Sequence, residues 1–298
     1  MKENQIIIKK KREDFRCNKK AACRGKRRLP PFYIKNRNES TARAGDFPEG
    51  FLKRSKGFYL SSEDFNMIYK NITEAIFLRR TNRFSAFVCL EEKEIQVHVK
   101  NTGRCRELLQ EGARVFLEPA DNPLRKTKYS LISVCKRNLL VNMDSQAPNQ
   151  VAAEAIAAGR IPEIGRVSLL RREVVFGNSR FDLYFEHENR RGFIEVKGVT
   201  LEEEGICKFP DAPTTRGRKH ILELMEAVKA GYEAYVLFVI QMAGTKIFYP
   251  HWERDKAFSE ALCKGAEAGV KILAYDCKVE RDSLTLNKKI FVSLEPPQ

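Results

Sequence analysis

Residues 234–240 form the most apolar stretch of this 298-residue chain, and the stretch has the length of a single strand. Its side chains are apolar on both faces of an extended strand, which is typical of a strand buried in a sheet that helices cover on both sides. In the preceding residues 216–230, apolar residues recur with helical spacing, and Gly231 follows as a stop signal. The C-terminal half is therefore predicted to be an α/β domain.

The remaining patterns of the C-terminal half support the same architecture. Helices are predicted over residues 150–158, which Gly159 ends, and over residues 259–268. Strands are predicted over residues 169–176, 180–185, 193–199 and 270–275. No apolar run reaches the roughly 18 residues that a membrane-spanning helix needs, so we expect no membrane partner.

Between Ile76 and Val134 the pattern changes to short strands separated by glycine and polar turns. Strands are predicted over residues 83–88, 95–99, 113–117 and 129–134, with one short helix near residues 104–109. These elements favour a small β-barrel, with the OB-fold as the leading candidate. The polar segment 142–149 is the expected boundary. The prediction is an α+β two-domain protein, with an OB-like barrel at residues 67–145 and an α/β domain at residues 146–298.

Most of the net charge of +15 lies at the N-terminus. Residues 1–66 hold 18 Lys and Arg against 8 Asp and Glu, so they carry ten of these charges. They have no sustained apolar period, and we expect a disordered basic tail. Three interpretations stay open: an arm that binds phosphates, a solvated tail, or a stretch ahead of a natural start at Met67. We favour the last two.

The eight cysteines show no C-x-x-C spacing, and no neighbouring histidines complete a zinc site. Scattered cysteines in a chain of this size fit a reducing compartment better than a disulfide framework. The N-terminus carries no apolar block of signal-peptide type. These features predict a cytoplasmic protein.

Strand periodicity singles out a carboxylate in the predicted strand at residues 180–185. Phe181, Leu183 and Phe185 alternate along this strand, so we expect them to share one face. Asp182 is then expected on the opposite face. A turn at residues 187–192 follows, so the strand can pair with the next strand as a hairpin.

The next strand carries a second charged pair. Ile194 and Val196 are expected to face the core, which leaves Glu195 and Lys197 together on the other face. Pairing of the two strands can bring Asp182, Glu195 and Lys197 onto one surface. For Glu195 and Lys197 alone, an exposed ion pair of no special function is about as plausible, because such pairs are common and weak.

Two converging carboxylates repel each other unless a cation lies between them. Hard oxygen ligands suit Mg²⁺ or Mn²⁺, which keep bound waters and accept phosphate oxygens. Such an ion polarises a phosphodiester and activates a water, and Lys197 beside it can orient that water or offset negative charge. Asp182, Glu195 and Lys197 are therefore the candidate catalytic residues, with Asp182 and Glu195 as metal ligands. Glu173 or Asp211 could add a third carboxylate, although each is expected to be an ordinary strand or turn residue.

A basic cluster begins the helix predicted at residues 216–230. Thr214 or Thr215 is a plausible N-cap, so the first turn contains Arg216, Arg218, Lys219 and His220. Cations at a helix N-terminus oppose the helix dipole unless an anion compensates them, and a phosphate would do so. Arg216, Lys219 and His220, together with Arg180, are candidate nucleic-acid contacts. Taken alone, His220 is more often a structural residue.

Further basic residues lie in the barrel half, namely Arg79, Arg80, Arg83, Lys100 and Arg104. Phe84 and Phe87 are interleaved with them. Basic residues that follow phosphates and aromatic rings that stack on bases would suit single-stranded or flexible DNA. The alternative places both phenylalanines in the core, and we favour it for Phe87. Gly103 is expected in a tight turn with a positive φ.

Several longer motifs occur in a fixed order along the chain. They are residues 79–84 (RRTNRF), 97–104 (VHVKNTGR), 179–182 (SRFD), 195–201 (EVKGVTL) and 209–220 (FPDAPTTRGRKH). In these motifs the chain resembles the sugar fermentation stimulation protein A family over about residues 67–298. Thr81 stands where proline is expected in the first motif, and residues 1–66 have no counterpart.

The resemblance implies an OB-like N-terminal domain and a C-terminal domain similar to the PD-(D/E)xK nucleases. It implies DNA binding without sequence preference and a regulatory role in the use of sugars, maltose in particular. The family's nuclease-like residues correspond here to Asp182, Glu195 and Lys197. We therefore expect a DNA-binding protein with a Mg²⁺- or Mn²⁺-dependent nuclease-type site.

Two alternatives to a nuclease stay open. The first is a non-catalytic DNA-binding regulator of sugar utilisation, and the second is an interaction protein whose DNA affinity is incidental. RNA is an alternative to DNA as the partner. The sequence leaves the oligomeric state open, with a homodimer as one option.

Overall fold

The computed structural model describes residues 52–53, 59–60, 67–101 and 103–296. Within residues 1–66 it describes one short antiparallel pair, β1 (Leu52–Lys53) and β2 (Tyr59–Leu60). The other predictions for residues 1–66, the basic tail among them, lie outside the described residues.

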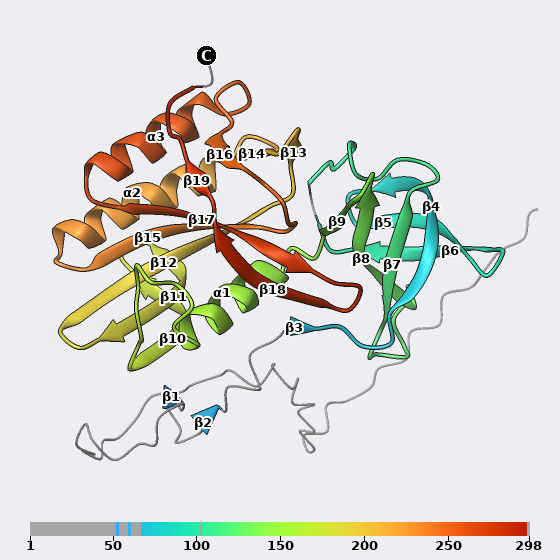
Figure 1. The fold of residues 1–298 in the computed structure, drawn as a ribbon, viewed down its shortest axis with the longest axis horizontal. Helices are drawn as coiled ribbons and strands as arrows, with labels where there is room; N and C mark the ends of the chain where they lie inside the picture. Colours follow the sequence, from blue (N-terminus) through green and yellow to red (C-terminus); the bar gives the residue numbers. More distant parts are fainter. Residues whose placement is uncertain (1–51, 54–58, 61–66, 102, 297–298) are drawn as a thin grey trace, which may run out of the picture. The chain divides into compact units, whose positions relative to one another are not determined.

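A closed five-stranded barrel forms the first domain (Figure 1). Its strands are β4 (Thr73–Asn82), β5 (Ser85–Leu90), β6 (Lys93–Val99), β7 (Arg114–Pro119) and β8 (Tyr129–Lys136). They lie in the order β6-β5-β4-β7-β8, and a parallel pairing of β6 with β8 closes the barrel. A further strand, β9 (Leu139–Asn142), forms a hairpin with β8. The predicted OB architecture is confirmed.

Alternation along β5 determines which side chains fill the barrel. Ala86 and Val88 are 0 % exposed, so Phe87 between them points to the outer face, where it is half-buried. The expectation that Phe87 belongs to the core is wrong, because its two neighbours already occupy the interior positions.

The helix expected near residues 104–109 is also absent from the described structure. The segment forms a single turn, in which the Leu109 amide donates to the Cys105 carbonyl at 2.9 Å. One such bond does not propagate, because Cys105 itself has a left-handed φ of 44°.

The second domain is built on a seven-stranded sheet in the order β10-β11-β12-β15-β17-β18-β3. The strands are β10 (Leu169–Phe176), β11 (Ser179–His187), β12 (Arg190–Val199), β15 (Glu233–Ile240), β17 (Lys271–Val279), β18 (Ser283–Lys289) and β3 (Met67–Ile68). The central strands β12, β15 and β17 are parallel, and the outer pairings are antiparallel. A smaller sheet holds β13 (Glu202–Glu203), β14 (Ile206–Phe209), β16 (Ile247–Pro250) and β19 (Phe291–Val292).

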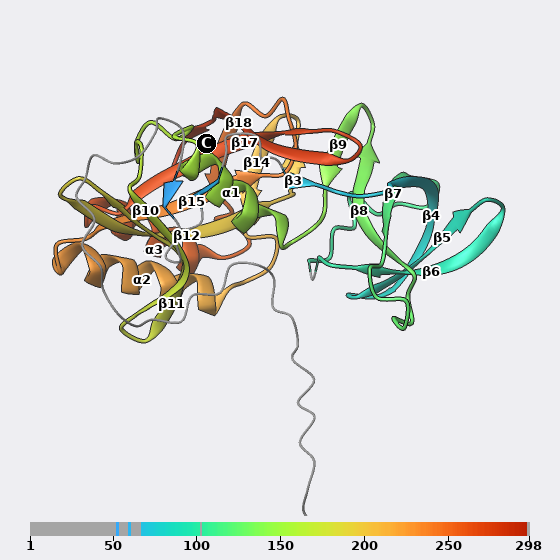
Figure 2. The same ribbon diagram turned by 90° about the horizontal axis from the view of Figure 1, so that it is seen from below.

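Helices cover both faces of the large sheet (Figures 1 and 2). Helix α1 (Ala147–Ala157) packs on one face, and α2 (Thr215–Lys229) and α3 (Lys256–Glu267) pack on the other. In β15, Leu237 belongs to the apolar cluster of α1, whereas its neighbour Phe238 belongs to the cluster of α2 and α3. Both side chains are fully buried, so the prediction of a strand covered on both faces is confirmed.

Helix α1 starts earlier than predicted, at Ala147 rather than at residue 150. Pro148 lies in its first turn, where a proline has no amide to leave unpaired and its fixed φ suits the helix. The polar segment before the helix is packed rather than loose. The buried Gln241 of the sheet domain donates to the Asn142 side chain at 2.9 Å and to the Asp144 carbonyl at 3.0 Å.

Strand β11 differs from its predicted pattern at one position. Leu183 and Phe185 lie in the cluster of α1, but Phe181 lies in the cluster of α2 and α3. The expectation that the three share a face is wrong, because the regular alternation is interrupted at Asp182. The residue opposite it, Glu173 of β10, has a left-handed φ of 56°, and the pairing register skips this position.

None of the helices that the structure describes is long and apolar enough to cross a membrane.

Candidate metal and nucleic-acid site

Asp182 lies where β11 separates from β12. The last residue pair between these strands joins Leu183 to Ile194. Beyond it, the Asp182 carboxylate replaces the missing main-chain partner, because its Oδ2 accepts a hydrogen bond from the Val196 amide at 2.8 Å. Its Oδ1 accepts a second bond from the Asn149 side chain of α1, also at 2.8 Å. Each Asp182 oxygen thus accepts one of these hydrogen bonds and keeps further lone pairs.

Glu195 is the most buried carboxylate of the candidate set, with only 3 % exposure. Its Oε1 accepts hydrogen bonds from Lys197 Nζ, at 2.5 Å, and from His220 Nδ1. Its Oε2 is buried and has no hydrogen-bond partner among the described residues. A buried carboxylate oxygen without a partner is costly unless a ligand completes it.

The two carboxylates respond differently to this environment. Burial, followed by the nearby charge of Glu195, raises the pKa of Asp182 above its ordinary value. Burial alone would also raise the pKa of Glu195, but the hydrogen bond from His220 and the charge of Lys197 lower it overall. Glu195 is therefore held ionised, and its charge acts on Asp182. The three predicted residues Asp182, Glu195 and Lys197 do lie together.

His220 reaches Glu195 from the first turns of α2. The side chain of Thr214 caps this helix and accepts from the Gly217 amide at 2.9 Å, which decides between the two predicted caps. His220 is only 6 % exposed, and its ring packs edge-on against Phe181. The structure thus buries His220 behind Glu195, away from the surface where a nucleic-acid contact was expected.

The burial of His220 could have been predicted from the spacing of small and apolar residues along α2. Gly217, His220, Leu224 and Ala227 follow one another at spacings of three and four, and all four are buried. His220 is therefore on the face of α2 that meets the sheet, whereas Arg216, Arg218 and Lys219 are exposed.

The donor set fits a hard divalent cation that keeps much of its water. Among the residues that the structure describes, no three or more His, Cys, Asp or Glu side chains are grouped to hold a metal ion. Two carboxylates, one with an unpartnered oxygen, match the way in which Mg²⁺ is bound, since it retains several waters. Glu173 lies instead at the surface with Arg180, at 3.7 Å.

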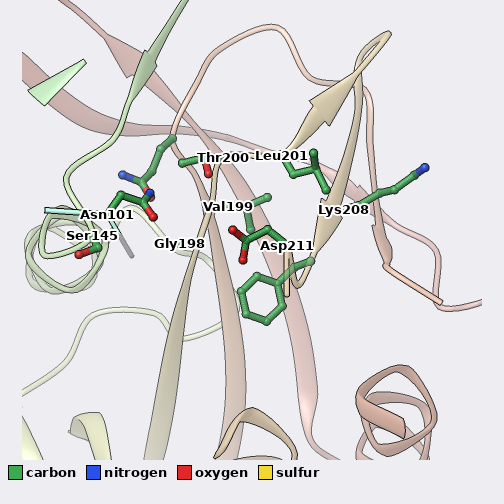
Figure 3. A pocket seen from close by; sticks show the side chains of 10 residues that line it. Asn101, Ser145, Gly198, Val199, Thr200, Leu201, Lys208 and Asp211 are labelled. Carbon is green, nitrogen blue, oxygen red and sulfur yellow. The ribbon is translucent and has the colours of Figure 1, made fainter. Parts of the chain in front are cut away.

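Asp211 lies in a separate pocket of about 110 Å³ at the end of β12 (Figure 3). Gly198 and Thr200 line one side of this pocket, and Asn101 of the barrel loop lines another. The barrel loop approaches closely, because a Cβ on Gly103 would lie 2.2 Å from Asp211 Oδ2. Gly103 is not among the positive-φ glycines, so the expected reason for a glycine there is wrong. A side chain at this position would have to displace the Asp211 or Asn101 side chain.

Arg80 is occupied by main-chain carbonyls. Its guanidinium has five N–H donors, and all five bond to carbonyl oxygens at 2.7 to 3.1 Å. The acceptors belong to Asn82, Arg83, Asn101, Gly103 and Arg104. Arg80 therefore ties the β4–β5 turn to the loop after β6, and a phosphate could reach it only by displacing these bonds.

Two more of the predicted contacts have protein partners. Lys100 donates to the buried Asp144 at 2.7 Å and so joins the barrel to the segment before α1. Arg79 forms an exposed two-bond ion pair with Glu94, and its guanidinium lies 4.4 Å from the centre of the Phe87 ring.

The other basic residues remain at the surface. Arg83 and Arg104 are exposed on the barrel, and the Phe84 ring beside Arg83 is 50 % exposed. Arg180 is exposed at β11. Lys219 donates to the Asn178 carbonyl at 2.9 Å, and it lies on the exposed face of α2 with Arg216 and Arg218.

Comparison with known proteins gives the family. A model described as "Sugar fermentation stimulation protein RE domain" matches residues 146–283, and one described as "SfsA N-terminal OB domain" matches residues 78–143. The sugar fermentation stimulation protein homolog of Alkaliphilus oremlandii is 58% identical over 229 residues, which cover 75% of this chain and 97% of that protein. The chain belongs to the sugar fermentation stimulation protein (SfsA) family.

Two further comparisons support the same family assignment. The homolog of Desulfitobacterium hafniense is 53% identical over 228 residues, covering 76% of this chain and 99% of that protein. The solved structure of Pyrococcus furiosus SfsA in complex with Ca²⁺ matches with a TM-score of 0.70 and 28% sequence identity, over 76% of this chain and 98% of that chain. The predicted family is thereby confirmed, as is the predicted fold class of an N-terminal OB domain followed by a C-terminal domain.

Proposed function

We propose that this SfsA-family chain binds DNA without sequence preference and hydrolyses phosphodiesters at a nuclease-like site that takes Mg²⁺ or Mn²⁺. The observation that carries the proposal is the buried Glu195 carboxylate, which has one oxygen held by two donors and the other without a partner beside Asp182. The Pyrococcus furiosus relative is described in complex with Ca²⁺, which supports a divalent cation for the family fold.

Each residue of the site has a distinct task in this proposal. Asp182 and Glu195 would hold the cation, which when bound polarises the phosphate and activates water. Lys197 donates to Glu195 at 2.5 Å, which would place its ammonium beside a phosphate held by the cation. There it offsets the negative charge that develops in the transition state. Asn149 and the Val196 amide keep Asp182 in place.

The DNA-binding surface in this proposal has two parts. Exposed Arg216, Arg218 and Lys219 surround the N-terminus of α2, where a phosphate is stabilised by both charge and helix dipole. On the barrel, Arg83 and Phe84 offer a cation and a half-exposed ring for a single strand. Arg104 and Arg180 are further exposed candidates. Three candidates are left out: Arg80 because all its donors bond to carbonyls, Lys100 because it pairs with the buried Asp144, and His220 because it is buried. A genomic DNA partner implies a cytoplasmic location.

A cleavage assay on the full chain tests the proposal. Wild type and Asp182→Asn are incubated with labelled single- and double-stranded DNA and RNA in Mn²⁺, Mg²⁺ or EDTA. We expect metal-dependent products from the wild type, loss of cleavage in Asp182→Asn, and similar salt-sensitive DNA binding by both. An Asp182→Asn variant that cuts as well as the wild type would refute the catalytic assignment.

A non-catalytic regulator of sugar utilisation is the second candidate. The relatives' name, sugar fermentation stimulation protein homolog, favours it, as does the small number of carboxylates at the site. This candidate predicts binding that weakens steeply with salt but no product in any metal.

A further inference from the structure

A chain of side-chain hydrogen bonds runs from the surface of α2 to Glu195. Arg216 Nε donates to His220 Nε2 at 3.4 Å, and His220 Nδ1 bonds to Glu195 Oε1. The two residues are four apart on the helix, so they lie on neighbouring turns of one side. This chain joins an exposed cation to the most buried carboxylate of the site.

The bonding pattern selects one form of the histidine. An arginine can only donate, so His220 Nε2 must accept, and the ring proton must then lie on Nδ1. With its proton on Nδ1, His220 donates to Glu195 Oε1. A neutral imidazole of this tautomer satisfies both neighbours at once.

The ring has little freedom to turn away from Glu195. It is 6 % exposed and packs edge-on against Phe181, with the ring centres 6.2 Å apart. The helix that carries it packs closely on α3, because a Cβ on Gly217 would lie 3.1 Å from the Phe258 ring. The orientation of His220 is therefore determined by packing as well as by its hydrogen bonds.

Two donors on Glu195 Oε1 leave the other oxygen, Oε2, as the one available to a cation. We propose that His220 is a positioning residue that, with Arg216 behind it, holds Glu195 in the rotamer that presents Oε2 to the metal. The inference rests on the proposed function for its metal site. Without the His220 donor, only Lys197 would constrain the carboxylate, and that flexible ammonium could follow it into other rotamers.

Arg216 can also link this device to the substrate. Among the described residues it bonds to His220 through Nε alone, so its two terminal nitrogens can still receive a phosphate in the proposed DNA surface. A phosphate held there would fix the guanidinium and its Nε–H toward His220. Metal binding and phosphate binding would then favour each other.

Calorimetric titration of Mn²⁺ into the full chain tests the assignment. His220→Leu keeps the bulk but removes the donor, and we expect the dissociation constant to rise about 10- to 100-fold, as is typical when a partner of a metal ligand is lost. His220→Asn places an N–H near the position of Nδ1, and we expect it to restore most of the affinity. His187→Leu, at the far end of β11, is the matched control and should leave the affinity unchanged.

A second measurement needs no metal. Long-range ¹H–¹⁵N spectra of the imidazoles should show a neutral Nδ1–H ring whose signals disappear in His220→Asn. Equal Mn²⁺ affinities in the wild type, His220→Leu and His220→Asn would overturn the inference while leaving the metal site intact. Equal losses in both His220 variants would overturn it too, because the donor would not matter. A wild type that binds no metal would instead remove the proposed site, and this inference with it.

Discussion

Arg80→Ala removes a guanidinium whose five N–H groups all donate to main-chain carbonyls. Three of these carbonyls lie in exposed surroundings, where water can take the place of the arginine. The bonds to the Asn101 and Gly103 carbonyls are half-buried, and each is expected to contribute about 1–1.5 kcal/mol. The free energy of unfolding should therefore fall by about 2–3 kcal/mol.

The neighbouring arginine provides the control. Arg79 forms an exposed ion pair with Glu94, whose partners are 54% and 46% exposed. Exposed pairs contribute little, because water and salt screen them. Arg79→Ala should therefore destabilise the protein far less than Arg80→Ala, although the two residues are adjacent and carry the same charge.

Urea unfolding followed by circular dichroism measures the difference. Hydrogen exchange of the Val99 amide, which donates to the Phe84 carbonyl beside the Arg80 loops, gives a local measure. DNA binding at several salt concentrations completes the test, since loss of a phosphate contact would lower the salt slope by about one. A stable Arg80→Ala variant with a reduced slope would refute the structural role and return Arg80 to the DNA surface.

Three further substitutions test other parts of the structure. Gly103→Ala puts a Cβ 2.2 Å from Asp211 Oδ2, so the free energy of unfolding measured in urea should fall by about 1–3 kcal/mol. Adding Asp211→Ala should restore part of this stability, because it removes the clash. If the effects of the two substitutions simply add, the clash is not the cause. Burial raises the pKa of Glu202, but its 2.8 Å bond from Lys136 lowers it overall, so its stabilisation is present above the unfolded pKa and is lost as pH falls through the folded pKa. Glu202→Gln should accordingly cost about 1–3 kcal/mol near neutral pH and almost nothing in acid, as measured by urea unfolding at both pH values; a constant cost would exclude the ion pair as its source. Phe84→Ala should weaken single-stranded DNA binding by about 1–3 kcal/mol in a fluorescence titration, and unchanged affinity would place the strand elsewhere.

Features with a period along the sequence could be predicted. The two-sided burial of β15, the hairpin of β11 and β12 and the shared face of Glu195 and Lys197 all follow from alternation within one strand. The cap of α2 follows from residue chemistry at a helix start. Such local rules were sufficient to place Glu195 and Lys197 on one face of their strand.

Features that depend on contacts between distant segments of the chain could not be predicted from the sequence. Arg80 bonds to residues up to 24 positions away, and nothing in its own strand distinguishes it from Arg79. The interruption at Asp182 lies opposite Glu173, whose left-handed φ is a conformation that glutamate rarely adopts. The position of His220 was accessible from the helical face of α2, but its partner on another element was not.

The bond from the Val196 amide to Asp182 has a consequence for how such proteins are compared. This carboxylate closes the gap between two strands whether or not any chemistry takes place nearby. A related protein without cleavage activity would still need a hydrogen-bond acceptor for this amide. An aspartate at this position in a relative is therefore evidence for the same strand arrangement and not for catalytic activity. It also makes Asp182→Ala a poor inactive variant, since that change opens a sheet edge, whereas Asp182→Asn retains an oxygen for the amide. The position that would report on the proposed activity is Glu195, whose Oε2 has no hydrogen-bond partner among the described residues.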